Sequence, residues 1–248
     1  MTASSARGTD LSHPPAEPGD VAGARDASRR GRTRERLLDA ALEVFAQHGV
    51  HAVSIEQITE RAGFTRGAFY SNFTSKEELF FALMERENGL RLAALREQIT
   101  VLQPRIEAAL APLDEVRLGE VILDLLRGPF DNHKWYVVQS EFRLLAMRDR
   151  TVAPQLAAHQ QRFTDSCTPI VEDTVRQAGR EFVVDVRAAV ALLARVYEDG
   201  LEASILAGRD VHDMDEVRTD LARAVLVLTR PLTPPPTTPA TRPRPAER

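Results

Sequence analysis

The stretch that decides the fold is residues 54–79, SIEQITERAGFTRGAFYSNFTSKEEL. Ser54 precedes Gln57 by three residues, which is the spacing of a capping box at the start of a helix. Three apolar residues then recur on one helical face, at Ile55, Ile58 and Ala62. Gly63 is the residue type that commonly ends a helix. The spacing therefore predicts a helix over about 54–62.

A second, short helix is expected over about 65–71, after a turn centred on Gly63–Phe64. Two helices joined by a short turn that contains Gly form a helix-turn-helix, which in DNA-binding proteins places the second helix in the major groove. The pattern alone is weak evidence, because any corner between two helices resembles it. The motif is predicted at about 54–73.

The flanking segments strengthen this prediction. Residues 33–48 carry helically spaced apolar residues before Gly49, at Leu38, Ala41, Leu42 and Phe45. A helix beginning near Ser75 shows a second capping-box spacing, with Glu78 three residues on. The result would be a compact three-helix unit followed by a linker helix.

Beyond residue 100 the sequence predicts further helices near 104–111, 114–127, 131–149, 152–178, 184–208 and 214–229. Pro169 is expected to kink or split the helix over 152–178. Long alternating runs and Asn-Gly or Asp-Gly hairpins are absent, so no strand is predicted and the fold class is all-α. Residues 1–30 and the Pro-rich 231–248 are expected to be disordered tails.

Composition points to a protein of the cytoplasm. The chain of 248 residues is 43% hydrophobic and 27% charged, without an apolar run long enough to span a membrane or serve as a secretory signal. The single cysteine, Cys167, cannot form an intrachain disulfide. Net charge is −4, yet residues 29–76 hold eight basic and five acidic residues. A basic segment on an acidic body suits local contact with a polyanion, or is simply a solvated helix face.

The segment 31–91 resembles the DNA-binding domain of the tetracycline-repressor (TetR-like) family. The resemblance rests on Arg36, Leu38, Ala40, Ala41, Phe45, Gly49, Ser54, Ile58, Ala62, Gly63, Gly67, Tyr70, Phe73, Lys76 and Leu79. Thr59 and Phe64 depart from the family pattern. The resemblance implies an N-terminal DNA-binding domain over 31–91 and a ligand-binding, dimerising helical domain over 92–230.

Candidate DNA contacts follow from the physics of groove recognition. The start of the second helix would face base edges, with Arg66 able to fork onto guanine and Ala68 able to touch a thymine methyl. Gly67 would allow close approach, and Thr65 would cap the helix. Phosphate contacts are predicted from Arg32 in a basic arm and from Ser54, Tyr70, Ser75 and Lys76. The alternatives are an ordinary exposed Arg66, serines that only cap, a tyrosine that only packs and a solvated arm.

The body offers candidates for a ligand pocket and a dimer interface. Residues 130–149 are rich in aromatic and aliphatic side chains, and the predicted pocket residues are Phe130, His133, Trp135, Gln139, Phe142 and Met147. The resemblance implies that helices near 152–178 and 184–208 pair with their copies in a homodimer. Packing within one chain is the alternative for these faces.

The predicted function is a ligand-responsive, sequence-specific DNA-binding regulator, a repressor released from a near-palindromic operator by a small apolar or amphipathic molecule. No catalytic constellation, phosphate loop or metal-ligand spacing is present, so neither an enzyme nor a cofactor is predicted. The alternatives are an architectural DNA binder without sequence preference, an activator or corepressor-dependent regulator of the same fold, and a carrier or enzyme with an idle DNA-binding domain.

Overall fold

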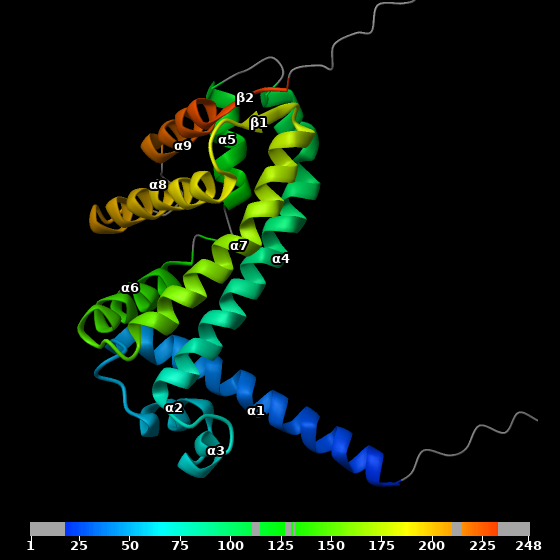
Figure 1. Ribbon diagram of the computed structural model, residues 1–248. Coiled ribbons are helices and arrows are strands. Elements are labelled where there is room, and N and C mark those ends of the chain that lie inside the picture. Colours follow the sequence, from blue (N-terminus) through cyan, green and yellow to red (C-terminus); the bar gives the residue numbers. More distant parts are fainter. Residues whose placement is uncertain (1–17, 111–114, 127–129, 131, 210–214, 233–248) are drawn as a thin grey trace, which may run out of the picture.

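The structure, a computed structural model, describes residues 18–110, 115–126, 130, 132–209 and 215–232 (Figure 1). Helix α1 (Pro18–His48) is followed by three helices of the DNA-binding region, α2 (Ile55–Ala62), α3 (Arg66–Tyr70) and the start of α4 (Lys76–Leu110). The body adds α5 (Glu115–Leu126), α6 (His133–Arg148), α7 (Ala153–Gln177), α8 (Val186–Leu206) and α9 (Asp215–Leu228). The predicted all-α fold class is confirmed.

Two long helices, α4 and α7, run side by side and connect the two ends of the molecule (Figure 1). Helices α2 and α3 lie at the lower end, whereas α5, α8 and α9 pack together at the upper end (Figure 1). Helix α6 packs against α1 and α7, which places the body in direct contact with the DNA-binding region.

One continuous core joins the DNA-binding region to the body. It contains Phe45, Ile58, Phe69 and Phe80 of the first four helices and Phe73 of the loop between α3 and α4. It also contains residues of α6 and the start of α7, namely Trp135, Val138, Phe142, Ala146, Val152 and Leu156. Since buried side chains are closely packed, a shift of α6 must be felt by α1 and α4.

The structure corrects the sequence predictions at the helix boundaries. Residues 18–30, expected to be disordered, continue helix α1, because their Ala and Arg residues favour a helix already nucleated by 31–48. The separate helix predicted near 104–111 belongs to α4, which includes Pro104. Likewise α7 includes Pro169 and is not split. A single missing backbone hydrogen bond does not end helices packed along their length against neighbours.

The structure also contains a strand pair that the sequence did not predict. β1 (Arg180–Phe182) pairs antiparallel with β2 (Thr229–Pro231), and Glu181 lies opposite Arg230. The Arg180 guanidinium donates hydrogen bonds of 2.9 Å to the hydroxyl and to the carbonyl of Thr229. Three residues are too few for an alternating pattern, so this pairing leaves no signal in the sequence. It also includes Pro231, the first residue of the predicted C-terminal tail; residues 1–17 and 233–248 of the tails lie outside the described residues.

Candidate DNA-binding surface and candidate effector site

The predicted helix-turn-helix forms as expected from its caps. The Ser54 hydroxyl accepts a hydrogen bond from the Gln57 N–H at 3.2 Å, and the Gln57 side chain accepts one from the Ser54 N–H at 2.8 Å. Gly63 has φ 69°, in the left-handed region, and ends α2. Thr65 then caps α3 by accepting from the Ala68 N–H at 3.3 Å. Both capping predictions, for Ser54 and Thr65, are confirmed.

Arg36 fastens the turn to helix α1. Its guanidinium donates a 2.7 Å hydrogen bond to the Ala62 carbonyl and lies 4.5 Å from the centre of the Phe64 ring. Carbonyls at the end of a helix have no partner within it, so the bond to Ala62 satisfies one of them. Phe64, a departure from the family pattern, thus supplies the face on which Arg36 stacks.

The aromatic residues in α3 and just after it divide into a buried and an exposed set, as predicted. Phe69 and Phe73 are fully buried and 5.7 Å apart between ring centres. Tyr70 is 47% exposed and meets Phe69 edge to face. Its hydroxyl is therefore accessible, and a contact from it to a DNA phosphate stays a prediction.

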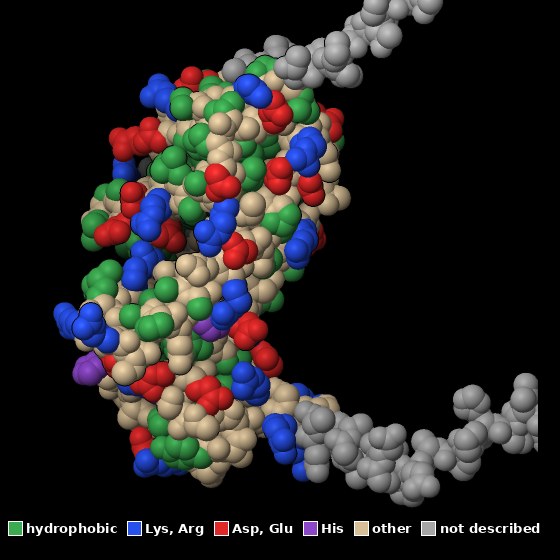
Figure 2. All heavy atoms as spheres, viewed as in Figure 1, with side chains coloured by type: hydrophobic (Ala, Val, Ile, Leu, Met, Phe, Trp, Pro, Cys, Tyr) green, Lys and Arg blue, Asp and Glu red, His purple; other side chains and the backbone are tan. Residues whose placement is uncertain are grey.

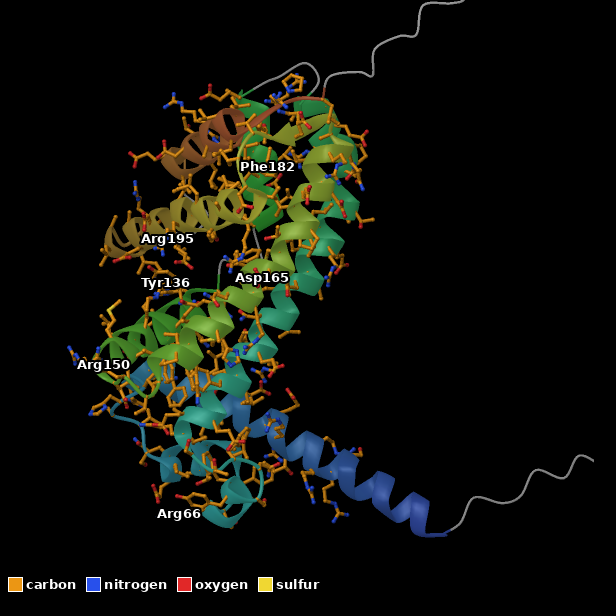
Figure 3. The ribbon with its side chains drawn as sticks, viewed as in Figure 1. Arg66, Tyr136, Arg150, Asp165, Phe182 and Arg195 are labelled. Carbon is orange, nitrogen blue, oxygen red and sulfur yellow. The ribbon has the colours of Figure 1, made fainter. Side chains whose placement is uncertain are left out.

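Arg66 projects from the lower end of the molecule, where α3 starts (Figure 3). Its guanidinium forms a 2.6 Å ion pair with Glu56 of α2 and a 3.3 Å hydrogen bond to the Tyr70 hydroxyl. The Tyr70 hydrogen bond and the Glu56 charge raise the pKa of Arg66. Because the ion pair is exposed to water, it is a weak restraint that DNA could displace.

The residues beside Arg66 leave room for a close approach. A Cβ placed on Gly67 would meet only the Thr65 hydroxyl, at 3.7 Å. Ala68 is partly buried, and Thr65 is exposed. These positions suit the predicted contacts to base edges, which stay predictions in the absence of bound DNA.

Lys76 has a role that the sequence did not reveal. Its ammonium donates hydrogen bonds to three carbonyls of the loop between α1 and α2, at 2.8 Å to Val50, 3.3 Å to His51 and 2.9 Å to Val53. Burial lowers the pKa of Lys76. An ammonium has three protons, and each is directed at this loop. In this conformation Lys76 holds the loop and is not free for the predicted phosphate contact.

The remaining phosphate candidates lie on helix ends or on α1. The Ser75 hydroxyl accepts from the Glu78 N–H at 3.1 Å, so the predicted cap of α4 forms. The Glu78 carboxylate accepts from Thr74 rather than from Ser75, which lowers the pKa of Glu78. Arg32 is exposed on α1 and donates to the Ser28 hydroxyl at 3.1 Å. The basic arm is thus helical.

The electrostatic surface of this end is mixed. Acidic and basic side chains are interspersed over the lower part of the face shown in Figure 2. Arg34, on α1, is partly buried, and its guanidinium carbon lies 4.5 Å from the centre of the Phe73 ring. Attraction to DNA would therefore depend on a few placed cations rather than on a broad basic field.

The six predicted pocket residues do not converge on one cavity. Trp135 and Phe142 are buried in the core shared with the DNA-binding region, and Phe142 stacks on Phe80 with 3.4 Å between ring centres. His133 is exposed, Met147 is 73% exposed and Gln139 is partly buried. Phe130 lies beside the same Arg91 guanidinium as Trp135, and its ring centre is 6.3 Å from that of Tyr197. The helical turn of α6 carries these side chains to different faces, which a count of apolar residues could not resolve.

A separate hollow of about 670 Å³ lies where the start of α4 meets the start of α7. Its walls mix polar and apolar surface, and the polar residues include Ser75, Asp149, His159 and Arg162. The His159 ring stacks on Phe81 with 5.0 Å between centres. None of the six predicted pocket residues lines this hollow.

Other classes of site find no support in the described residues. In that part of the chain no group of three or more His, Cys, Asp or Glu side chains is arranged to hold a metal ion. Among the same residues, none of the helices has the length and apolar character needed to cross a membrane.

Comparison with known proteins decides the family. Residues 37–83 match the family model described as bacterial regulatory proteins, tetR family. The chain is 30% identical over 169 residues to the transcriptional activator FasR of Mycolicibacterium smegmatis, covering 66% of this chain and 69% of that protein. The chain belongs to the tetR family. It is therefore a helix-turn-helix transcriptional regulator and not an enzyme.

Other tetR-family proteins resemble it over most of its length. The transcriptional repressor AcnR of Corynebacterium diphtheriae is 24% identical over 184 residues, covering 74% of this chain and 86% of AcnR. A crystal structure of a tetR-family regulator from Mesorhizobium loti has a TM-score of 0.62 at 17% identity, covering 81% of this chain and 98% of that one. The crystal structure of the FadR regulator of Bacillus subtilis, in complex with stearoyl-CoA, has a TM-score of 0.57 at 18% identity. The match covers 76% of this chain and 96% of the FadR chain.

Proposed function

We propose that this tetR-family protein is a homodimeric, sequence-specific repressor in the cytoplasm that a small amphipathic effector releases from a near-palindromic operator. The observation that carries the proposal is the exposed face of α3, where Arg66 at its start and Tyr70 at its end project from a helix fixed by buried Phe69 and Phe73. A rigid support with exposed hydrogen-bonding side chains is what reading of a major groove requires.

A route between the body and the DNA-binding region supports regulation by an effector. The Glu141 carboxylate of α6 accepts a 2.6 Å hydrogen bond from the Val50 N–H, while Lys76 holds the Val50 carbonyl. Movement of α6 would thus shift the loop that leads into α2. In a dimer, such shifts would change the distance between the two recognition helices and the affinity for the operator.

The effector class is inferred from chemistry in the body and from a relative. FadR of Bacillus subtilis binds stearoyl-CoA in its crystal structure, and that ligand joins an apolar chain to a charged group. Helix α6 and its neighbours here offer aromatic side chains beside charged ones. We therefore expect an amphipathic rather than a purely polar effector.

Dimerisation is inferred from the family rather than from contacts within one chain. Helix α8 exposes Leu192, which is 47% exposed, as well as Ala203 and Ala207. Gly200 of α8 packs against α9, since a Cβ there would lie 2.0 Å from a methyl group of Val217, so this part of α8 is not available to a partner. The proposed dimer face is thus the remainder of α8 together with α7.

Activation of transcription is the second candidate. FasR, to which the chain is 30% identical, is an activator, whereas AcnR is a repressor. A promoter fusion separates the two: repression predicts that deleting the gene raises expression from the bound promoter, and activation predicts a fall. A rise would support the proposal made here.

Band-shift titration with the DNA upstream of the protein's own gene tests sequence-specific binding. We expect a specific complex that Arg66→Ala weakens, whereas the exposed control Arg150→Ala does not (Figure 3). If five or six phosphates are neutralised, log affinity should fall with log salt with a slope of roughly −5. Equal binding to random DNA would indicate the architectural alternative instead.

A further inference from the structure

Arg91, on α4, is half-buried in the body and has no hydrogen-bond partner among the described residues. Its guanidinium carbon is 5.2 Å from the ring centre of Trp135 and 5.9 Å from that of Phe130. Within the described part of the chain, its N–H groups form neither a hydrogen bond nor an ion pair. Burial lowers the pKa of Arg91 to about 10, and the charges of Glu87 and Glu198 oppose this shift. The side chain is therefore a cation at neutral pH.

Two buried donors lie on α6, and one of them belongs to Trp135, whose ring faces the Arg91 guanidinium. The Trp135 indole N–H is fully buried and has no acceptor in the described residues, and the same is true of the Arg143 Nε. The Arg143 guanidinium lies 3.5 Å from the Glu198 carboxylate of α8. The charge of Glu198 also acts on Arg91. Buried donors are nearly always satisfied in folded proteins, so the unsatisfied Trp135 N–H beside the Arg91 guanidinium calls for an acceptor.

The side chains on the other side of the Arg91 guanidinium are largely apolar. Phe130 lies 6.3 Å from both Phe163 of α7 and Tyr197 of α8, measured between ring centres. Cys167 of α7 is buried, which raises its pKa to about 11 against the opposing charges of Arg96 and Arg91. Figure 2 shows the surface hollowed where α8 faces α6. Tyr136 reaches across to α8, since its hydroxyl donates a 2.9 Å hydrogen bond to Glu202 (Figure 3).

We propose that Arg91 and Trp135 bind the carboxylate of the effector, which is an organic acid with an apolar chain or ring. The proposal rests on the regulatory function proposed above and adds the chemical class of the effector. The guanidinium fork matches the two carboxylate oxygens, and the indole N–H supplies one further donor. The apolar part would lie against Phe130, Phe163 and Tyr197. A neutral analogue would leave the guanidinium without its acceptor, so the site should discriminate strongly against it.

The single tryptophan makes the site directly observable, because Trp135 is the only fluorophore of its kind in the chain. The full-length protein is titrated with decanoate, dodecanoate and 4-phenylbutyrate, each against the alcohol of the same skeleton, below micelle formation. We expect at least one acid to change Trp135 fluorescence saturably and to bind at least tenfold more tightly than its alcohol. The proposal is overturned if no acid binds or if the alcohols bind equally well.

Variants separate a role in binding from a role in folding. Arg91→Gln should weaken binding of the acid at least tenfold and that of the alcohol less than threefold, whereas the exposed control Arg150→Gln should match the wild type. If Arg91→Gln does not fold, Arg91→Lys keeps the charge without the fork and should still lose several-fold affinity. An Arg91 variant that folds and binds the acid as the wild type does would contradict the assignment.

Two further comparisons sharpen the result. Trp135→Phe retains the ring and removes the N–H, and calorimetry should show at least a threefold loss for the acid. Dodecanoyl-CoA has a thioester in place of the acid; binding tighter than that of dodecanoate would overturn the carboxylate assignment. The band shift of the protein without added acid tests operator binding separately, so failure of the effector proposal is distinguishable from failure of the regulatory function.

Discussion

Glu141 accepts a 2.6 Å hydrogen bond from the backbone N–H of Val50, and this bond joins helix α6 of the body to the loop that leads into the helix-turn-helix. The two residues are 91 positions apart in the sequence. A Cβ on the neighbouring Gly49, at φ 83°, would lie 2.9 Å from the same carboxylate, so glycine is needed there for two reasons. The contact places a charged group of the body directly at the end of α1.

Removing the Glu141 carboxylate should weaken the coupling between helix α6 and the loop that leads into the helix-turn-helix. Glu141→Ala leaves the Val50 N–H unpaired, and we expect a loss of about 1–3 kcal/mol in the free energy of unfolding, measured by urea denaturation. We also expect a weaker response of operator affinity to the effector. Glu97→Ala, an exposed change on α4, is the control and should leave both quantities unchanged. A Glu141→Ala variant as stable as the wild type would show that the hydrogen bond from Val50 to Glu141 does not contribute to the free energy of unfolding.

Lys76 should behave as a structural residue. Lys76→Met keeps the apolar stem and removes the ammonium from three carbonyls, so the free energy of unfolding should fall by about 1.5–3 kcal/mol. The salt dependence of operator binding should keep its slope, because the ammonium does not face DNA. Arg32→Ala, by contrast, removes one cation from each protomer and should make the slope for the homodimer less negative by about 2. A less negative slope of log affinity against log salt for Lys76→Met would instead indicate that Lys76 contacts a DNA phosphate.

These contacts show where sequence reasoning reaches its limit. The caps of Ser54 and Thr65 and the turn at Gly63 involve neighbours within three residues, so spacing alone predicts them. The partners of Lys76 lie 23 to 26 residues upstream, and the partner of Glu141 lies 91 upstream. Such pairs depend on how helices pack. The same holds for Trp135 and Phe142, which the pattern marked as apolar but could not assign to the shared core rather than to a cavity.

Glu56 should compete with DNA for Arg66. The exposed ion pair between them is worth up to about 1 kcal/mol. Glu56→Gln frees the guanidinium, and operator affinity at low salt should rise by up to about fivefold. Glu60→Gln is the control. Glu60 is also exposed on α2, and its substitution changes the net charge equally without breaking the ion pair between Glu56 and Arg66. Equal gains for both variants would mean that only net charge matters; fluorescence anisotropy with labelled operator measures the difference.

Stability should depend on pH through His159. Burial lowers the pKa of His159 in the folded protein, and the Arg162 charge lowers it further. The unfolded chain therefore binds a proton first as pH falls below about 6.5, and stability is lost through that range. His159→Gln should lose less stability between pH 7 and pH 5 than the wild type does. Parallel pH profiles of the two proteins in urea denaturation would contradict this.

The central claim, that the start of α3 reads a specific sequence, is tested most directly by selection from random double-stranded DNA with the wild type and with Arg66→Ala. We predict that the wild type selects a near-palindrome whose half-sites are centred about one helical turn apart, ~34–36 Å in the plain helix-turn-helix arrangement. Arg66→Ala should lose preference at one base pair of each half-site, at about 1–3 kcal/mol of discrimination. Recovery of no common sequence by the wild type, or the same sequence with the same preference by Arg66→Ala, would contradict the account.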